Sequence, residues 1–221
     1  MSFTAFSLGQ VVKKGTEYQF LMKWEKGRTY RFLGTILVED IVAGKNHLLF
    51  NTQVPVVVTV KNVQSGIATL LVGTELPAVK GSKVKGVHST VEIDQHGNIV
   101  KGEPGTAAAM FGKWYPKTPI HVGSKWQFSL QHFGPLTGFV PKKKFDVECI
   151  FSGFKGSKDK ELTEIKISTL EKSKTSMSGS FLVNVSDGLL NEMNILYSVE
   201  MPVPPKQPKV RRVAKVSIKR S

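Results

Sequence analysis

Alternation of apolar and polar side chains runs through most of the chain and predicts β-strands. Apolar residues occupy every second position over residues 18–24 and again over residues 30–38, and Lys26-Gly27 separates the two stretches, which predicts a hairpin. Pro55 interrupts a later Val-rich stretch, where its missing N–H group predicts a sheet edge or a bulge. Further alternating stretches occupy residues 67–72, 91–93, 126–130, 145–151, 165–167, 181–185, 195–201 and 214–218.

These stretches predict a mainly β protein with one large antiparallel sheet of about 10–12 strands, strongly curved into a half-barrel or closed into a barrel. Pro104-Gly105-Thr106, followed by apolar residues as far as Phe111, predicts one short helix. No internal repeat and no clear linker divides the chain. Residues 15–221 are therefore expected to form a single β-rich domain.

The N-terminal segment, residues 1–14, bears on cellular location. Ala5-Phe6-Ser7 has the small-x-small form of a signal-peptidase site, but the apolar stretch before it is shorter than the about 7–15 residues of a signal peptide's apolar region. We therefore expect a signal remnant on a periplasmic or secreted protein, with a cytoplasmic protein as the alternative. No apolar run reaches the about 18 residues that a membrane-spanning helix needs.

The chain is strongly basic, with 31 Lys and Arg against 17 Asp and Glu and a formal net charge of +14. Such a charge suits polyanions such as nucleic acid, anionic lipid headgroups and acidic polysaccharide, although basic side chains on solvated strand faces give the same balance. Residues 206–221 contain no acidic residue. This segment supplies the candidate polyanion-binding residues, which are Lys206, Lys209, Arg211, Arg212 and Lys215.

The basic C-terminal segment has two interpretations. It contains no aromatic residue that could stack on bases, and its end alternates like a strand. We therefore favour a charged strand that protects a sheet edge from aggregation over an arm that binds nucleic acid. A loop with Lys80, Lys83 and Lys85 is a second basic region that the polyanion hypothesis would use.

Motifs of zinc peptidases, serine hydrolases, phosphate-binding loops and dinucleotide-binding folds are absent from the sequence. His88, Glu92, Asp94 and His96 share one face of an expected strand. Eight residues of strand span roughly 26 Å, which is too far for one metal ion to be bound by all four. Because the opposite face is apolar, these side chains are expected to be exposed.

Two further groups were considered for catalysis. Asp146 and Glu148 share a polar strand face with Lys142 and Lys144 close by in the chain, and we expect ordinary cross-strand ion pairs here rather than an acid–base pair. Cys149 is the only cysteine and falls on the apolar face of the same strand, where its thiol is expected to be protonated and inert. The sequence thus predicts no enzyme, no disulfide, no metal site and no cofactor.

Aromatic residues give the more informative cluster, in and just after the expected helix. They either plug the open side of the sheet or form a lid over an apolar cavity, because a curved sheet with an apolar face has to be filled by protein or by a ligand. The candidate ligand-binding residues are Met110, Phe111, Trp114 and Tyr115 of this cluster, with Trp126 and Phe128 of the strand that follows.

Three stretches occur in an order that resembles a group of bacterial envelope proteins. Residues 89–100 contain a strand that closes with D-x-x-G, residues 119–126 read P-x-x-V-G-x-x-W, and residues 179–190 end with G-L-L. That group is similar to the half-barrel of periplasmic lipoprotein carriers, in which a curved antiparallel sheet surrounds a helical plug. The resemblance covers Gly15 to Arg220, but the chain lacks a complete signal and a lipobox cysteine near its start. It implies an envelope protein and carries over no catalytic residue.

Our leading hypothesis is a non-enzymatic protein of the cell envelope that binds an apolar or lipid-like ligand in the concave face of its sheet. One alternative is a polyanion-binding or nucleic-acid-binding module that uses the basic C-terminal segment. The other is a purely structural scaffold whose sheet is filled by its own side chains. Among partners, an apolar small molecule and an anionic surface fit the sequence better than nucleic acid.

Overall fold

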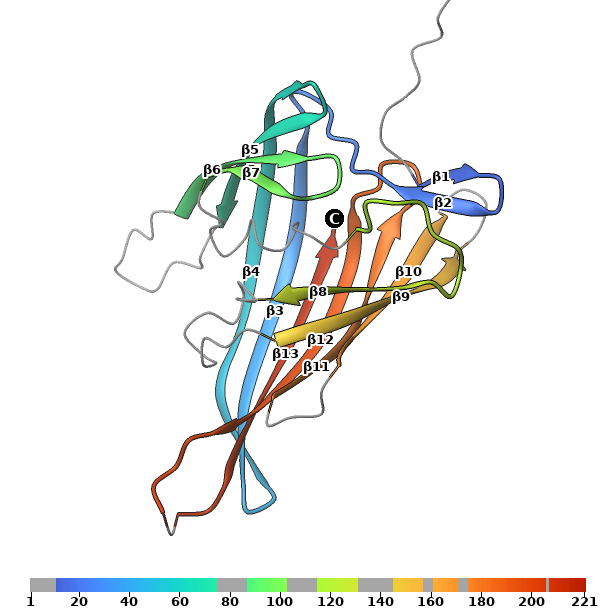
Figure 1. The fold of residues 1–221 in the computed structure, drawn as a ribbon. Coiled ribbons are helices and arrows are strands. Elements are labelled where there is room, and N and C mark those ends of the chain that lie inside the picture. Colours follow the sequence, from blue (N-terminus) through green and yellow to red (C-terminus); the bar gives the residue numbers. More distant parts are fainter. Residues whose placement is uncertain are drawn as a thin grey trace, which may run out of the picture.

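The computed structural model describes residues 11–74, 87–102, 115–130, 145–156, 161–170, 175–205 and 207–221, and thirteen β-strands form the regular structure of these residues (Figure 1). The strands are β1 (Val11–Lys14), β2 (Glu17–Phe20), β3 (Thr29–Val42), β4 (Lys45–Gln64), β5 (Ile67–Thr74), β6 (Val87–Asp94), β7 (Ile99–Lys101), β8 (Lys125–Leu130), β9 (Phe145–Lys155), β10 (Leu162–Thr169), β11 (Thr175–Asn184), β12 (Leu190–Met201) and β13 (Val210–Arg220). The short helix expected before Phe111 lies outside the described residues.

Eleven strands form one antiparallel sheet in the order β7-β6-β5-β4-β3-β13-β12-β11-β10-β9-β8. The chain runs outward from β3 in the middle to β7 at one edge, crosses to β8 at the other edge, and returns to the middle with β13. The sheet is curved and open, because no described residue of β7 pairs with β8 (Figure 1). This confirms the large curved antiparallel sheet expected from the alternation.

One face of this sheet carries the hydrophobic core. In β3, Tyr30, Phe32, Ile36 and Val38 are buried at alternate positions, and their register neighbours in β4, β13 and β12 continue the apolar face. Each fully buried apolar side chain of this kind stabilises the folded state by about 1.5–3 kcal/mol relative to an exposed one. The buried residues of this face elsewhere in the sheet are Val56, Val58, Val60, Ala68, Leu70, Val72, Val91, Ile93, Val147, Cys149, Phe151, Ile165, Ile167, Met177, Phe181, Val183, Met193, Ile195, Tyr197, Val199, Ala214, Val216 and Ile218.

The segment before β3 does not form the expected hairpin. β2 pairs with β1 instead, and residues 21–24 leave the strand and cross one end of the sheet. There the Met22 amide donates to the Gln95 carbonyl at 2.6 Å, and the Lys23 amide donates to the Asp187 carbonyl at 2.7 Å. The prediction was wrong because alternation indicates an extended chain but not its partner. Leu21, at the opposite parity, is buried as well, since the segment is covered on both sides.

The basic C-terminal segment forms β13, which confirms that it is a charged strand. It does not protect an edge, however, because β13 lies in the middle of the sheet between β12 and β3. Its alternate residues enter the apolar face, and the intervening Lys215 and Lys219 are exposed on the outer face. The alternation identified the strand but could not show which strands would flank it.

Pro55 lies where the sequence placed it, at an edge. β4 pairs with the described residues of β5 only from Val56 onward, whereas β3 pairs with β4 from Lys45 to Thr59. Pro55 therefore sits on the part of β4 that has no described neighbour on its second side, where a missing N–H group breaks no ladder.

Candidate functional site

The apolar face of the central strand β13 is bounded at both ends by an ion pair. Arg212 donates to Asp40 of β3 from two nitrogens, at 2.7 and 2.9 Å, and Arg220 donates to Asp187 at 2.7 Å. Between these arginines, Ala214, Val216 and Ile218 face the core. The two arginines are eight residues apart, so the apolar strip is roughly 26 Å long.

The Asp40–Arg212 pair was missed by the sequence analysis. Both side chains are mostly buried, with 16% and 19% of their surface exposed. Hydrogen bonds from Arg212 hold the pKa of Asp40 below its usual value, and the same contact raises the pKa of Arg212. Because this pair is ionised and mutually satisfied, it closes the apolar face with a polar boundary rather than with a reactive group.

Aromatic rings gather at the end of the sheet that residues 21–24 cross. Phe20 contacts Phe151 edge-on at 5.1 Å between ring centroids and Tyr115 at 5.6 Å. The Tyr115 hydroxyl donates to the Gly188 carbonyl at 2.7 Å, and burial raises its pKa above the usual value. Tyr115 is thus anchored in the core at this end, next to the turn between β11 and β12.

The other candidate ligand-binding residues are only partly described. Trp126 and Phe128 lie half-buried on the edge strand β8, in register with Cys149 and Val147, so they belong to the apolar side of the sheet. Met110, Phe111 and Trp114 lie outside the described residues. The role in ligand binding of these five residues and of Tyr115 therefore stays a prediction.

Cys149 occupies the core position that its parity predicted. Its side chain is fully buried, and burial raises the pKa of its thiol to about 12. The burial confirms the predicted core position, and a thiol with so high a pKa stays protonated at neutral pH.

The residues considered for metal binding have structural roles or separate positions. The Asp94 carboxylate accepts hydrogen bonds from the backbone amides of His96 and Asn98 at 2.9 and 2.8 Å, which fixes the turn between β6 and β7. His88 is exposed on β6. In the described ranges no three His, Cys, Asp or Glu side chains are placed to bind a metal ion together.

The paired carboxylates on β9 have partners on the neighbouring strand. Glu148 lies 3.1 Å from Lys125 of β8, which confirms a cross-strand ion pair, and Asp146 accepts a hydrogen bond from Ser129. Lys142 and Lys144 lie outside the described residues. The sequence pattern predicted the kind of contact but did not identify Lys125 and Ser129 as the partners.

The candidate polyanion-binding residues are largely engaged within the sheet. Arg212 binds Asp40, Arg211 donates to the Ser198 hydroxyl at 2.6 Å, and Lys215 lies 3.8 Å from Glu39. Lys209 is exposed, and Lys206 lies outside the described residues. The described part of the segment is therefore built into the sheet as a strand, with Arg212 and Lys215 next to acidic side chains.

Comparison of the sequence with family models and with curated proteins finds no match. Among solved structures, one of lipovitellin that concerns lipid–protein interactions matches with a TM-score of 0.57 and 10% identity over 90% of this chain. This chain spans only 25% of the lipovitellin chain. The likeness defines the class of fold, a large open antiparallel β-sheet, and at this identity it shows the fold alone.

Two bacterial structures also match. One is an exported protein with a YmcC-like fold from Bacteroides fragilis, with a TM-score of 0.31 and 9% identity over 89% of this chain and 97% of that one. The other is a LolA superfamily protein from Nitrosomonas europaea, with a TM-score of 0.20 and 9% identity over 90% of this chain and 86% of that one. At these TM-scores and identities the two matches carry no argument about this chain.

Proposed function

We propose that this protein is a non-enzymatic carrier that holds an apolar, lipid-like molecule against the apolar face of its sheet, and that it acts outside the cytoplasm. The observation that carries the proposal is the apolar face of an open sheet, which on the central strand β13 is bounded at both ends by a charged pair. An acyl chain that spans one leaflet of a bilayer is about 15 Å long, so the strip of β13 between Arg212 and Arg220 is long enough for such a chain.

The topology supports a lid on this face. The chain has to pass from β7 at one edge of the sheet to β8 at the other, and Tyr115 is anchored to Gly188 on the way. We assign the lid to the residues just before this anchor, Met110, Phe111 and Trp114. The fold likeness to part of lipovitellin, a protein whose solved structure concerns lipid–protein interactions, supports the choice of a lipid-like ligand.

Native mass spectrometry of the purified protein tests the proposal directly. The expected result is a bound mass that leaves on activation and extracts into organic solvent. A clean 24.4 kDa species, together with no binding of the fluorescent fatty acid cis-parinaric acid, would overturn it. Cell fractionation tests the location, and recovery of the native protein with cytoplasmic markers would contradict that part of the proposal.

The lid assignment has its own test. The double variant F111A/W114A is expected to bind cis-parinaric acid at least about tenfold more weakly, because two large apolar contacts are lost. The matched control is L33A/L196A, which removes two exposed leucines from the outer face. Equal affinity of F111A/W114A and the control would contradict the lid while leaving the ligand site itself in place.

A further inference from the structure

Four strands extend beyond their neighbours at the end of the sheet opposite the aromatic cluster. In the described part of the chain, β5 pairs with β4 only from Val56 onward, and β11 pairs with β12 only as far as Val199. The remaining parts of β4, β3, β13 and β12 stay paired with one another and project from the molecule, at the bottom of Figure 1. We call residues 41–51 and 201–211 the sheet tip, of which all but Lys206 are described.

Two adjacent leucines on the sheet tip are exposed. The register pairs Leu48 with Glu39 and Phe50 with Val38, so Leu49 is the extra residue of a β-bulge. A bulge interrupts the alternation of side chains, and here both leucines lie in solvent, with exposed fractions of 61% and 48%. Leu48 is the most exposed large apolar residue that the structure describes. Adjacent exposed leucines on a projecting hairpin mark a surface that binds something apolar.

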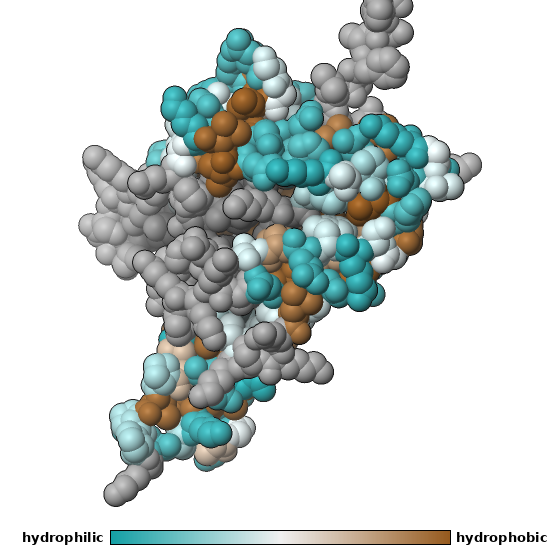
Figure 2. All heavy atoms as spheres, viewed as in Figure 1, coloured by the Kyte–Doolittle hydropathy of each residue, from teal (hydrophilic) through white to brown (hydrophobic). Residues whose placement is uncertain are grey.

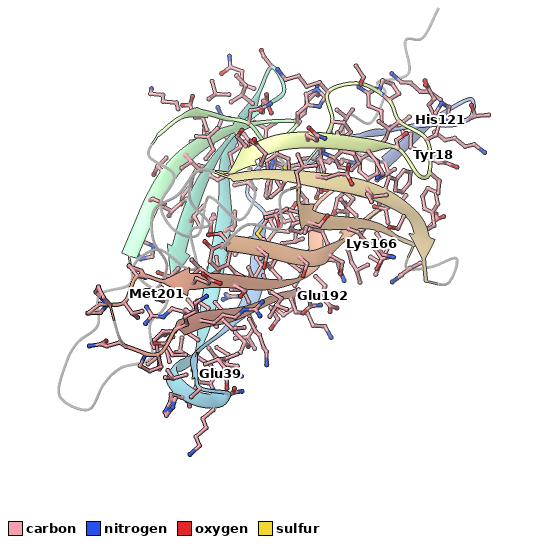
Figure 3. The ribbon with its side chains drawn as sticks, turned by 60° about the horizontal axis from the view of Figure 1, so that its bottom comes forward. Tyr18, Glu39, His121, Lys166, Glu192 and Met201 are labelled. Carbon is pink, nitrogen blue, oxygen red and sulfur yellow. The ribbon has the colours of Figure 1, made fainter. Side chains whose placement is uncertain are left out.

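Further apolar side chains lie on the sheet tip. Val42, Val210 and Met201 are register neighbours across β3, β13 and β12, and each is half-buried. Ile41 is also half-buried, and by register it shares the face of Leu48, opposite to these three. Apolar and polar side chains are mixed on this projection, at the lower end of Figure 2, and Met201 and Glu39 lie far from Tyr18 and His121 in Figure 3.

The charge of the sheet tip is basic. Its two segments contain Lys45, Lys206, Lys209 and Arg211 and no acidic residue. The acidic residues that border the tip face basic partners. Glu39 lies 3.8 Å from Lys215, Asp40 binds Arg212, and Glu200 is the register partner of Arg211.

We propose that the sheet tip docks on an anionic lipid bilayer, with Leu48 and Leu49 inserted at the boundary between headgroups and acyl chains. The exposed Lys45, three residues before Leu48 on β4, and the exposed Lys209, just before β13, supply positive charge on the same tip for acidic headgroups. Exposed apolar side chains flanked by basic ones are what such an interface binds, since each group meets its complement. A second copy of the chain fits less well, because two tips in contact would bring like charges together. The docking is independent of any ligand on the apolar face.

Sedimentation with lipid vesicles tests the docking. The wild-type protein is expected to pellet with vesicles of phosphatidylcholine and phosphatidylglycerol, and much less with phosphatidylcholine alone or at high salt. The variant L48S/L49S is expected to lose at least about tenfold in affinity, whereas the control L33S/L196S keeps wild-type binding. Failure of the wild type to bind anionic vesicles, or equal binding by L48S/L49S, would overturn the proposal.

A labelling experiment locates the contact. The variants L48C and L33C are each coupled to an environment-sensitive fluorophore, and the buried Cys149 is protected from the reagent. Anionic vesicles are expected to shift the emission to the blue at position 48 and leave it unchanged at position 33. A blue shift without vesicles that rises with protein concentration, accompanied by a dimer in sedimentation equilibrium, would instead identify a contact between copies and overturn the docking.

Discussion

Replacement of Gly188 by alanine is expected to destabilise the protein for two separable reasons. Gly188 has a φ of +64°, and a Cβ at this position would overlap the Leu21 carbonyl oxygen and approach the Leu21 carbonyl carbon to 2.8 Å. The left-handed backbone alone costs an alanine about 1–2 kcal/mol. The overlap is with backbone, so residues 21–24 have to move away from the turn.

That movement strains two hydrogen bonds at the turn. The Lys23 amide donates to the Asp187 carbonyl at 2.7 Å, and the Tyr115 hydroxyl donates to the Gly188 carbonyl at 2.7 Å. Loss of each contributes about 1 kcal/mol, so the total expected for G188A is about 3–4 kcal/mol. G15A is the matched control, because Gly15 has a φ of +65° and an added Cβ there has nothing within 4 Å.

Urea and thermal denaturation measure the difference between the two variants. G188A is expected to unfold with a free energy about 2 kcal/mol lower than that of G15A and a Tm about 4–8 °C lower. If the two variants lose equal stability, the backbone conformation accounts for the whole effect. The close passage of residues 21–24 over the turn would then have no energetic consequence, and the reasoning would be refuted.

Three further predictions concern single groups. D40N is expected to lower the free energy of unfolding by about 1.5–3 kcal/mol at pH 7. Because the pKa of Asp40 is lowered in the folded state, the wild type loses this contribution as the pH falls below about 4, whereas D40N has none to lose. The denaturation curves of the two proteins therefore converge in acid. Cys149 should resist iodoacetamide in the native protein at about pH 8 and react in urea, as read by mass; rapid native alkylation would contradict its burial. Y115F removes the hydrogen bond to Gly188 and should lower the free energy of unfolding, measured by urea titration, by about 1 kcal/mol. An unchanged midpoint would exclude an anchoring role for the Tyr115 hydroxyl.

The alternation in the sequence was sufficient to assign most side chains to a face of the sheet. The parity of Cys149 alone placed it correctly in the core. Parity also predicted correctly which face of the sheet carries Trp126 and Phe128. A strand has only two faces, so a period of two residues determines this assignment once the strand is recognised.

The partners of each strand could not be predicted in the same way. Asp40 and Arg212 are 172 residues apart, and no local pattern indicates that β3 and β13 are neighbours. The same lack of information led to the wrong hairpin before β3 and to the wrong position for the basic strand. The sequence does contain a sign of the exposed leucines at the sheet tip. Leu48 and Leu49 are adjacent and so interrupt the alternation, a few residues after the turn at Ala43-Gly44.

The position of β13 has a consequence for how the molecule is made. Among the described strands, those from β3 to β7 and those from β8 to β12 form two ladders that β13 alone joins, and β13 follows all of them in the chain. Synthesis from the N-terminus therefore produces two separate half-sheets, each with an unpaired central edge, until residues 210–220 emerge and fill the seam. Such long-range pairing is slow and leaves strand edges open to aggregation. A nascent chain of this design needs protection until its assembly is complete, whether by a chaperone or by delayed folding.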